Sequence, residues 1–505
     1  MIPDQTMQSV SDAEIVERAT ALPEFHAFPT VDELLARLES LRVEFPDLLT
    51  VRRIGTSRLG EPISLYTLNV DRHHPSSAPS RDAYEHEGSG EPRNRGLIVG
   101  GVHPNEPIGS LTIIQVLTDL LADNVLRERL NIEWHVIPCA DPDAMRLNEG
   151  WFSAPFDGET YFRNFYRPPG NEQVEWTFPV SYKEKYFDEM MPETQALQRV
   201  IDDVRPDFYV PLHNSETGGA YYYMSQSLSD MVPLLHRLPA EFGIPLHLGE
   251  PESAHSQVVA PAVFAAGSVE RVYEWREANG LDPVPEGGAG QSSTSYARRY
   301  GTVSLIAELP IWKTFGADDT SHSTANYAAL LREAGEALMA TGNQLTELMR
   351  QVHRNLTLDS PFLRSARAFI PGMYRAGELM MRRATMPEND RLATVAERPL
   401  SIVWMYRLRY GGALLRALSA EVAAGMAGVR VRRAADDLEA IWSRWLSQRL
   451  AREQTEGIPI RGVVGVQYGA VIGLAARARA LGETDRTNST SSVVNDLPKV
   501  EEGRR

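Results

Sequence analysis

A histidine and a glutamate three residues apart form the strongest chemical signal in the sequence. His103 and Glu106 occur in GGVHPNEPIGS (100–110), between an apolar run and the expected start of a helix. An i, i+3 pair at such a turn can direct both side chains at one ion, and Gly100 and Gly101 allow the backbone to turn sharply. Imidazole nitrogen and carboxylate oxygen are both zinc ligands. Taken alone, the pair is also explained by a helix N-terminal glutamate beside an unrelated histidine.

A second histidine stands at the end of another apolar run. His213 closes that run in VPLHNS (210–215). In open α/β sheets, ligand sites lie beyond the carboxyl ends of strands, which is the position expected for both His103 and His213. The structural alternative for His213 is a capping or core histidine satisfied by the backbone. Because both strand-end histidines are present, we predict that His103, Glu106 and His213 hold one zinc ion per chain, with water as the fourth ligand.

A further glutamate is embedded in an apolar strand. Glu308 lies within SLIAELP (304–310). A buried carboxylate is costly unless it is paired, linked to a metal or functional, and its structural alternative is a salt bridge. Zinc lowers the pKa of its bound water from ~15.7 toward ~7, so that a nearby carboxylate can accept the water's proton. We therefore predict that Glu308 is the general base of a hydrolytic reaction.

Strand and helix patterns that alternate along the chain supply the scaffold for these residues. A helix is expected from Thr30, with Glu33 completing a capping box. Strand followed by helix followed by strand implies a parallel sheet with crossover helices. The expected strands are 48–55, 62–70, 95–103, 132–140, 207–214 and 302–312, the further helices are 106–121 and 193–204, and 71–95 is an expected surface loop.

The pattern changes after about residue 320, where strand signals give way to long helical stretches. These stretches are 325–353, 363–383, 401–426 and 430–453. We predict an all-helical C-terminal region, in which the apolar, glycine-interrupted segment 458–475 is packed rather than in contact with a membrane. The predicted organisation is a leader (1–29), a catalytic α/β domain (30–320), a helical C-terminal domain (321–481) and a disordered tail (482–505).

Composition and charge exclude several classes of protein. The 505-residue chain has 43% hydrophobic and 23% charged residues, which is typical of a globular protein. Its net charge of −16 disfavours nucleic acid as a partner, because an acidic surface repels phosphate. The one cysteine, Cys139, cannot form an internal disulfide. Residues 1–20 lack the features of a signal peptide and no apolar run reaches ~18 residues, so we expect a cytoplasmic enzyme without membrane contact.

The order of these residues resembles that of the zinc carboxypeptidases of the M14 type. A His-x-x-Glu pair is followed by a strand-end histidine and then by a strand-borne glutamate. The segment 31–63, VDELLARLESLRVEFPDLLTVRRIGTSRLGEPI, is also similar to that family. The resemblance covers roughly residues 30–312. It implies a mixed eight-stranded sheet flanked by helices, the same three zinc ligands, and Glu308 as the general base.

The resemblance also implies residues that bind the substrate. ADPDAMRLN (140–148) is similar to a family segment in which Arg146 would polarise the scissile carbonyl. YFRNFYRPP (161–169) is similar to another, in which Arg163 would clamp a terminal carboxylate. The structural alternative for Arg146 and Arg163 is an ion pair, on the surface or within the fold, that has no part in substrate binding. The predicted substrate-binding group is completed by Asn164 and Asn214, which adjoin Arg163 and His213.

The sequence departs from the family pattern at the clamp and near the first histidine. Phe162 stands where the family has an asparagine, and Thr160 stands where many members have the aspartate that orients the first zinc histidine. Asp141 and Asp157 are alternative candidates for that orienting role.

A further departure concerns the mobile tyrosine of the family. The corresponding stretch is VPEGGAGQSSTSYARRYG (284–301), in which Glu286 stands near the expected place. Tyr296 and Tyr300 are nearby but shifted in register.

The function predicted from these observations is that of a zinc-dependent metallocarboxypeptidase acting on a peptide bond near a free C-terminal carboxylate. One alternative is a zinc amidohydrolase of the same fold that acts on acyl-amino acids or on γ-linked cell-wall peptides, which the substitution at Phe162 favours. Another is an inactive binding scaffold that uses the helical region as its interaction surface. The expected partners are a peptide or amide substrate and a second copy of the chain, bound through the helical region.

Overall fold

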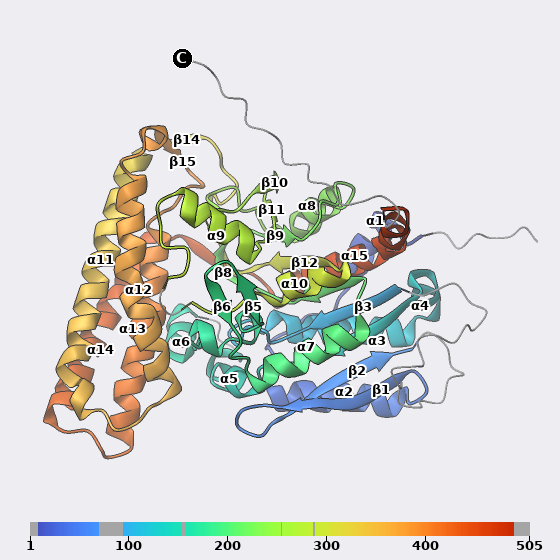
Figure 1. Ribbon diagram of the computed structural model, residues 1–505, viewed down its shortest axis with the longest axis horizontal. Coiled ribbons are helices and arrows are strands. Elements are labelled where there is room, and N and C mark those ends of the chain that lie inside the picture. Colours follow the sequence, from blue (N-terminus) through green and yellow to red (C-terminus); the bar gives the residue numbers. More distant parts are fainter. Residues whose placement is uncertain (1–8, 70–93, 154–156, 254, 286–287, 489–505) are drawn as a thin grey trace, which may run out of the picture.

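A mixed sheet of nine strands, with helices on both faces, lies beside a bundle of four long helices (Figure 1). The computed structural model describes residues 9–69, 94–153, 157–253, 255–285 and 288–488. The predicted mixed sheet is confirmed, with nine strands in place of eight. From edge to edge the order is β1 (Leu49–Thr56), β2 (Pro62–Leu68), β4 (Ile132–Ile137), β3 (Asn94–Val99), β7 (Phe208–Pro211), β12 (Val303–Glu308), β9 (Tyr221–Met224), β11 (Val263–Ala265) and β10 (Val258–Ala260).

The four central strands, β4, β3, β7 and β12, run parallel to one another. They are buried on both faces, because apolar side chains alternate between two cores. On β3, Ile98 joins one core, whereas Leu97 and Val99 join the other. Val99 pairs with Pro211 of β7, so the segments that follow these two strands leave the sheet at the same edge. This edge is where the sequence places His103 and His213.

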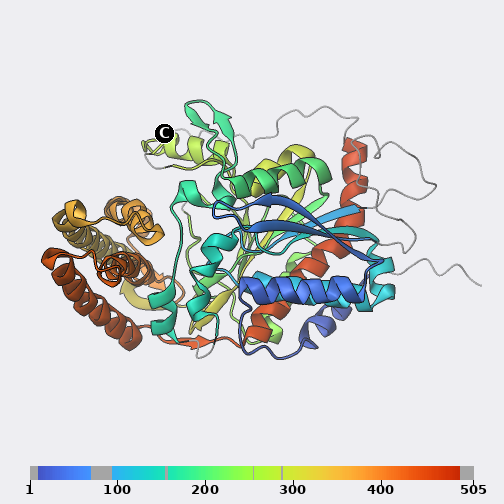
Figure 2. The same cartoon turned by 90° about the horizontal axis from the view of Figure 1, so that it is seen from below.

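Helices cover both faces of the sheet. The helix α7 (Pro192–Val204) packs on the core that contains Leu97 and Val99, together with α10 (Ser293–Ala297). Figure 2 shows α2 (Val31–Glu44) and α15 (Ile460–Asn488) on the opposite side of the strands from α7. Side chains of the bundle helices also join this second core, and the helices of the sheet domain that contribute to it include α1 (Asp12–Thr20), α2, α3 (Ile108–Ala122), α4 (Asn124–Leu130), α8 (Val232–Glu241) and α15.

Shorter elements complete the domain. The predicted strand 302–312 divides at Leu309, where the chain leaves the main sheet and enters a small sheet with the order β16 (Thr455–Gly457), β13 (Pro310–Thr314), β8 (Ser215–Gly218). The other short strands pair as β5 (Val180–Tyr182) with β6 (Lys185–Phe187) and β14 (His322–Asn326) with β15 (Leu392–Thr394). The short helices are α5 (Pro142–Arg146), α6 (Gly158–Asn164) and α9 (Val269–Ala278), and the 3-10 turns are Glu149–Trp151, Gly170–Glu172, Val174–Trp176, Arg298–Tyr300, His353–Asn355 and Pro387–Asn389.

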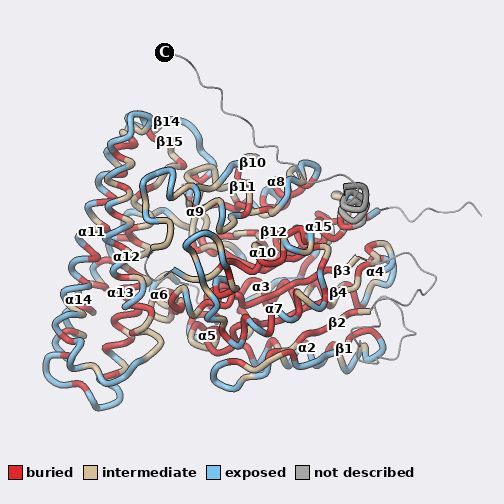
Figure 3. Tube along the Cα trace, viewed as in Figure 1, coloured by how far each residue is buried: buried red, intermediate tan, exposed pale blue. Residues whose placement is uncertain are grey.

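The helical C-terminal region predicted from the sequence is confirmed, and it has two parts. Four helices form the bundle, with exposed outward faces and buried inward ones (Figure 3). The last helix, α15, leaves the bundle and packs against α1, α3 and α8 on the sheet domain. The segment after residue 458 therefore belongs with the α/β domain. The bundle helices are α11 (Tyr327–Val352), α12 (Pro361–Arg383), α13 (Ser401–Ala423) and α14 (Val429–Arg452).

The N-terminal segment differs from the loosely structured leader that we predicted. It contains α1, whose N-terminus is capped by the Ser11 side chain. Ile15, Val16 and Ala19 of this helix are buried in the core. The acidic, polar composition of the segment hid a short apolar stripe at helical spacing, and that stripe is what docks on the domain.

Two predicted segments fall largely outside the described residues. These are the surface loop 71–95 and the tail 482–505, of which only the end of α15, to Asn488, is described. Among the described helices, none alone has the length and apolar character to cross a membrane, although α3 and α4, bent by 102° at their junction, pass that test as a pair.

Candidate metal centre

The turn between β3 and α3 brings His103 and Glu106 to the carboxyl edge of the sheet. Gly101 has φ +62°, and a Cβ there would stand 2.9 Å from Cys139 Sγ. A Cβ on Gly100 would stand 2.5 Å from the carbonyl oxygen of Pro138. Only glycine fits both positions, so the two glycines permit the sharp turn that presents His103 and Glu106.

His213 follows the neighbouring parallel strand β7 and meets this turn. The Nδ1 atom of His103 lies 3.0 Å from Glu106 Oε1, and that of His213 lies 3.0 Å from Glu106 Oε2. The two Nδ1 atoms are themselves 3.0 Å apart. All three residues are buried, with exposures of 5% for His103, 5% for Glu106 and 3% for His213. The predicted ligands therefore converge on one point.

The spacing of these atoms fits a divalent metal ion. Four ligands placed tetrahedrally around zinc at ~2.0–2.1 Å are separated by roughly 3.3 Å. Two imidazole nitrogens that face each other at 3.0 Å cannot both carry a proton, whereas both can ligate one ion. Among the described residues, His103, Glu106 and His213 form the group suited in number and spacing to hold a metal.

The charges in this group are strongly coupled. Burial, the Arg167 charge and the neighbouring His213 lower the pKa of His103 to about 3, although Glu106 opposes them. Burial also acts to lower the pKa of His213, but its hydrogen bond to Glu106 and the charges of Glu308 and Glu175 raise it to about 9. Burial acts to raise the pKa of Glu106, but the two histidines hold it well below its usual value. An anionic carboxylate beside imidazole nitrogens is a suitable environment for a cation.

Glu308 is the last residue of β12 and points toward the same group. Its side chain is 12% exposed, and its Oε1 lies 3.9 Å from His213 Nδ1. Burial and the nearby Glu106 raise its pKa well above the usual value, although the charges of His213 and Arg167 oppose the shift. The structure thus brings the predicted base beside the three predicted ligands.

An arginine that the sequence analysis did not select completes the group. Arg167 donates from Nη1 to Glu106 Oε1 at 2.8 Å and to Asn105 Oδ1 at 3.1 Å. Its Nε donates to Gln173 Oε1 at 2.8 Å, and its Nη2 donates no hydrogen bond to the described residues. Arg167 lies in the same segment as Arg163, residues 161–169. The sequence offered one signal for Arg167, which is that this segment contains a second arginine four residues after Arg163.

The structure places Arg163 away from the metal group, contrary to the prediction. Arg163 lies on α6 and forms ion pairs with Glu159 at 2.8 Å and with Glu439 of α14 at 2.9 Å. Its guanidinium also stacks over the ring of Trp442, 4.6 Å from the centroid. Because α6 turns this side chain toward the bundle, Arg163 is an interface residue.

Arg146 and Asn164 also have structural partners rather than site contacts. Arg146 forms ion pairs with Asp32 of α2 at 2.7 Å and with Glu61 at 3.2 Å. The Asn164 amide donates to the Thr160 carbonyl at 2.9 Å, within the last turn of α6. The structure therefore does not support their predicted roles in binding the substrate.

Asn214 is the predicted substrate-binding residue that does lie at the site. Its backbone N–H donates to Glu106 Oε2 at 3.3 Å. Its side-chain Oδ1 is buried and has no hydrogen-bond partner among the described residues. A substrate N–H group could satisfy this oxygen.

The expected orienting carboxylates do not contact His103. Asp141 caps α5 and Asp157 caps α6. The Nε2 atoms of His103 and His213 are buried without a hydrogen-bond partner in the described part of the chain. Neither aspartate therefore fills the role that the sequence suggested.

The aromatic surroundings of the site also differ from expectation. The hydroxyl groups of Tyr296 and Tyr300 donate to Asp202 of α7, away from the metal group, and Glu286 lies outside the described residues. Instead, the ring of Trp176 stacks beside His103, with centroids 6.3 Å apart and planes inclined by 24°. Trp176 is 41% exposed, so the site has one accessible aromatic face.

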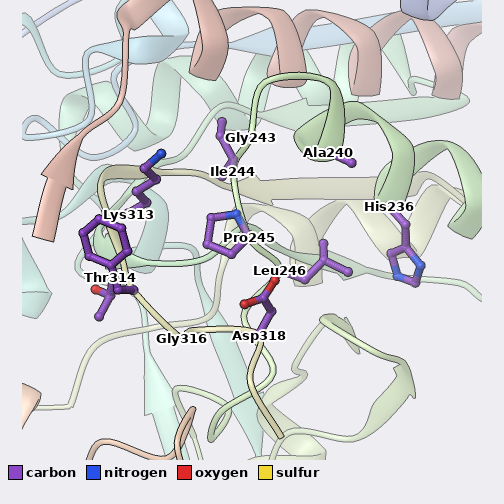
Figure 4. A pocket seen from close by; sticks show the side chains of 11 residues that line it. His236, Ala240, Gly243, Ile244, Pro245, Leu246, Lys313, Thr314, Gly316 and Asp318 are labelled. Atoms are coloured by element: carbon purple, nitrogen blue, oxygen red, sulfur yellow. The ribbon is translucent and has the colours of Figure 1, made fainter. Parts of the chain in front are cut away.

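A separate surface cavity of about 520 Å³ lies between α8 and β13 (Figure 4). Figure 4 shows Lys313, Leu246 and Asp318 among the side chains that line it. None of its lining residues belongs to the metal group. The cavity is therefore separate from the metal group.

Two histidines and two glutamates that meet at the carboxyl edge of an α/β sheet form a site suited to metal-dependent hydrolysis. Residues 34–241 match the family model for zinc carboxypeptidase, Peptidase M14. The chain thus contains a zinc carboxypeptidase domain in this range, which confirms the resemblance seen in the sequence. The match includes the three metal-group residues and Arg167, and it ends before Glu308.

Several solved structures are similar to this chain at low sequence identity. A candidate metallopeptidase from Shewanella amazonensis is 15% identical, with 55% of this chain and 84% of that chain covered and a TM-score of 0.36. Carboxypeptidase A from Helicoverpa armigera is 14% identical, with 74% and 79% covered and a TM-score of 0.34. A metallo-carboxypeptidase from Burkholderia cenocepacia is 15% identical, with 56% and 60% covered and a TM-score of 0.31. No curated protein matches the chain in sequence.

Proposed function

We propose that this protein is a zinc-dependent metallocarboxypeptidase that hydrolyses an amide bond near a free carboxylate of its substrate. The observation that carries this proposal is the convergence of His103, Glu106 and His213 at 3.0 Å contacts, with the buried Glu308 beside them. The zinc carboxypeptidase match over residues 34–241 supports the same chemistry.

His103, Glu106 and His213 are the residues that would hold the zinc ion. When bound, zinc supplies a Lewis acid that polarises the scissile carbonyl and lowers the pKa of a water molecule. The carboxylate of Glu106 contributes negative charge to this group, and Arg167 fixes the orientation of that carboxylate through a 2.8 Å hydrogen bond.

Glu308 is the proposed general base. Its position 3.9 Å from His213 places it beside the metal group, yet not in hydrogen-bond contact with that ligand. Burial raises its pKa, so that its carboxylate is a stronger proton acceptor than an exposed one. In the proposed reaction Glu308 accepts a proton from the attacking water and then donates it to the leaving amine.

Arg167 takes the role of carboxylate clamp in this proposal, in place of Arg163. The guanidinium has five N–H donors, and its Nη2 group donates to none of the described residues. A planar guanidinium with free donors suits a substrate carboxylate. Asn214 would accept a substrate N–H group, and the exposed face of Trp176 would contact an apolar part of the substrate.

Peptides with free and with amidated C-termini, incubated with zinc-loaded protein, test this function. We expect hydrolysis of the free peptides and at least 10-fold slower hydrolysis of the amidated ones, because the clamp then loses its charged partner. Equal cleavage of both would instead favour the amidohydrolase alternative. Glu308→Gln should abolish turnover while one zinc ion per chain remains. A wild-type protein that neither binds zinc nor cleaves any peptide would support the binding-scaffold alternative.

A further inference from the structure

A buried glutamine on the last helix contacts the backbone of a proposed zinc ligand. Gln467 lies on α15 and is completely buried. Its Nε2 donates to the carbonyl oxygen of His213 at 2.7 Å, across 254 residues of sequence. Its Oε1 accepts from the hydroxyl of Thr112 on α3, also at 2.7 Å. One side chain thus connects the His213 segment with the helix that follows Glu106.

The orientation of this amide is fixed by its partners. The carbonyl of His213 can only accept a hydrogen bond, so the NH₂ group of Gln467 must face it. The Gln467 oxygen then faces Thr112, whose hydroxyl can donate. Burial of an amide is costly unless both of its ends are paired, and here both are. The arrangement therefore has one low-energy orientation.

Close packing of α15 holds Gln467 in this position. Three glycines on one stripe of the helix allow it to approach α8, because a Cβ at any of them would overlap a side chain of α8 or of the residue that ends it. The apolar, glycine-interrupted segment seen in the sequence is explained by this contact. The glycines are Gly465, Gly469 and Gly473, and they face Phe242, Leu238 and Leu234 respectively.

We propose that Gln467 is a positioning residue for the metal site. It fixes the backbone at His213 relative to α3, and so sets the distance between the His213 ring and Glu106. This inference rests on the proposed zinc function. It makes the C-terminal helix a part of the metal site.

The zinc dissociation constant of Gln467→Met, measured by competition with a chromophoric chelator, tests this role. Methionine is similar in size but donates no hydrogen bond to His213. We expect zinc to bind about 10- to 100-fold more weakly, as is typical when a residue that supports a metal ligand is lost. Thr112→Val, which removes the partner of Oε1 alone, should weaken zinc binding by roughly 2- to 10-fold.

Tyr468→Phe is the matched control. Tyr468 is the next residue of α15, is equally buried, and donates to Asp119 of α3 at 2.8 Å without contact to the metal group. It should lower the melting temperature of the metal-free protein but leave the zinc affinity within about twofold of wild type. A purely structural role for Gln467 predicts the same result for Gln467→Met.

The possible outcomes separate this inference from the proposed function. Wild-type zinc affinity in a folded Gln467→Met protein would overturn the positioning role while the proposed function stands. If that variant does not fold, an unchanged zinc affinity of Thr112→Val overturns the role instead. A wild-type chain that binds no zinc overturns the proposed function, and the positioning role with it.

Discussion

The Nδ1 atoms of His103 and His213 lie 3.0 Å apart, although 110 residues separate them in the sequence. The contact follows from the pairing of β3 with β7, in which Val99 lies opposite Pro211. Parallel neighbours end at the same edge of the sheet, so the residues just beyond their ends meet there. The pairing of these two strands therefore brings the two histidines together.

Removal of one histidine should abolish tight zinc binding. We expect His213→Ala to weaken zinc affinity by more than about 100-fold, since a ligand contributes more than the supporting groups whose loss costs 10- to 100-fold. Zinc at 100 times the wild-type dissociation constant should stabilise the wild type by ~2.7 kcal/mol and the variant by less than ~0.5 kcal/mol. Metal content and thermal unfolding with and without zinc measure both effects.

His236→Ala provides the control for this experiment. His236 lies on α8 and contacts the carbonyl of Pro261 at 2.8 Å, outside the metal group. It should retain zinc and the zinc-dependent stabilisation. Equal zinc binding by His213→Ala and wild type would contradict the assignment of His213 as a ligand.

The two arginines of segment 161–169 should have different effects on catalysis. Arg167→Ala should raise the KM for peptides with a free C-terminus by about 10-fold or more, because it removes a charge-assisted hydrogen bond to the substrate. Arg163→Ala should leave kcat and KM unchanged. Its ion pairs are partly exposed, so the loss of stability should be about 1 kcal/mol or less. Steady-state kinetics on one free peptide compares both, and a KM effect confined to Arg163→Ala would reverse the assignment.

The difference between these arginines illustrates where sequence reasoning succeeded and where it failed. The ligands could be predicted because each depends on local pattern: an apolar strand that ends in a histidine, or an i, i+3 pair at a turn. The choice between Arg163 and Arg167 depends instead on where α6 ends and on what packs against it. Arg163 faces Glu439 of the bundle and Arg167 faces Glu106, and neither contact has a local signature.

The same distinction applies to the larger elements. The four bundle helices were predicted nearly to their ends, since each has a continuous apolar face of helical period. That α15 returns to the sheet and reaches His213 through Gln467 could not be predicted, because the contact is tertiary. The docking of α1 was missed for a similar reason. Its apolar stripe is short, and the surface that covers it comes from distant segments, chiefly α15 and α8.

A buried aspartate should make stability depend on pH. Burial raises the pKa of Asp141 to about 7, although Arg58 lies 3.6 Å away and opposes the shift. The unfolded chain releases this proton near pH 4 and the folded chain near pH 7. The contribution of Asp141 to the free energy of unfolding is therefore fully present below about pH 4 and decreases as the pH rises toward 7.

Asp141→Asn should remove this pH dependence. Asparagine retains an oxygen to accept the N–H of Ala144, as Asp141 does at 3.1 Å, so the cap of α5 is preserved. We expect the variant to be roughly 2–4 kcal/mol more stable than wild type at pH 8 and equal to it near pH 4. Urea unfolding at both values measures the difference. If the wild type instead becomes more stable relative to the variant as the pH rises, then the fold stabilises Asp141 as the anion.

The buried ion pairs of Glu216 should control how firmly the bundle is attached to the sheet domain. Glu216 lies on β8, three residues after His213, and accepts from Arg409 of α13 at 2.8 Å and from Arg449 of α14 at 3.3 Å. All three side chains are at least 87% buried. Glu216→Leu leaves two buried guanidinium groups without their shared carboxylate, which should lower the free energy of unfolding by about 3–5 kcal/mol.

Glu439→Leu, which breaks a more exposed pair between α14 and α6, should lower the free energy of unfolding by about 1 kcal/mol or less. Urea unfolding compares the two, and equal losses would mean that the Glu216 cluster contributes no more than a surface pair.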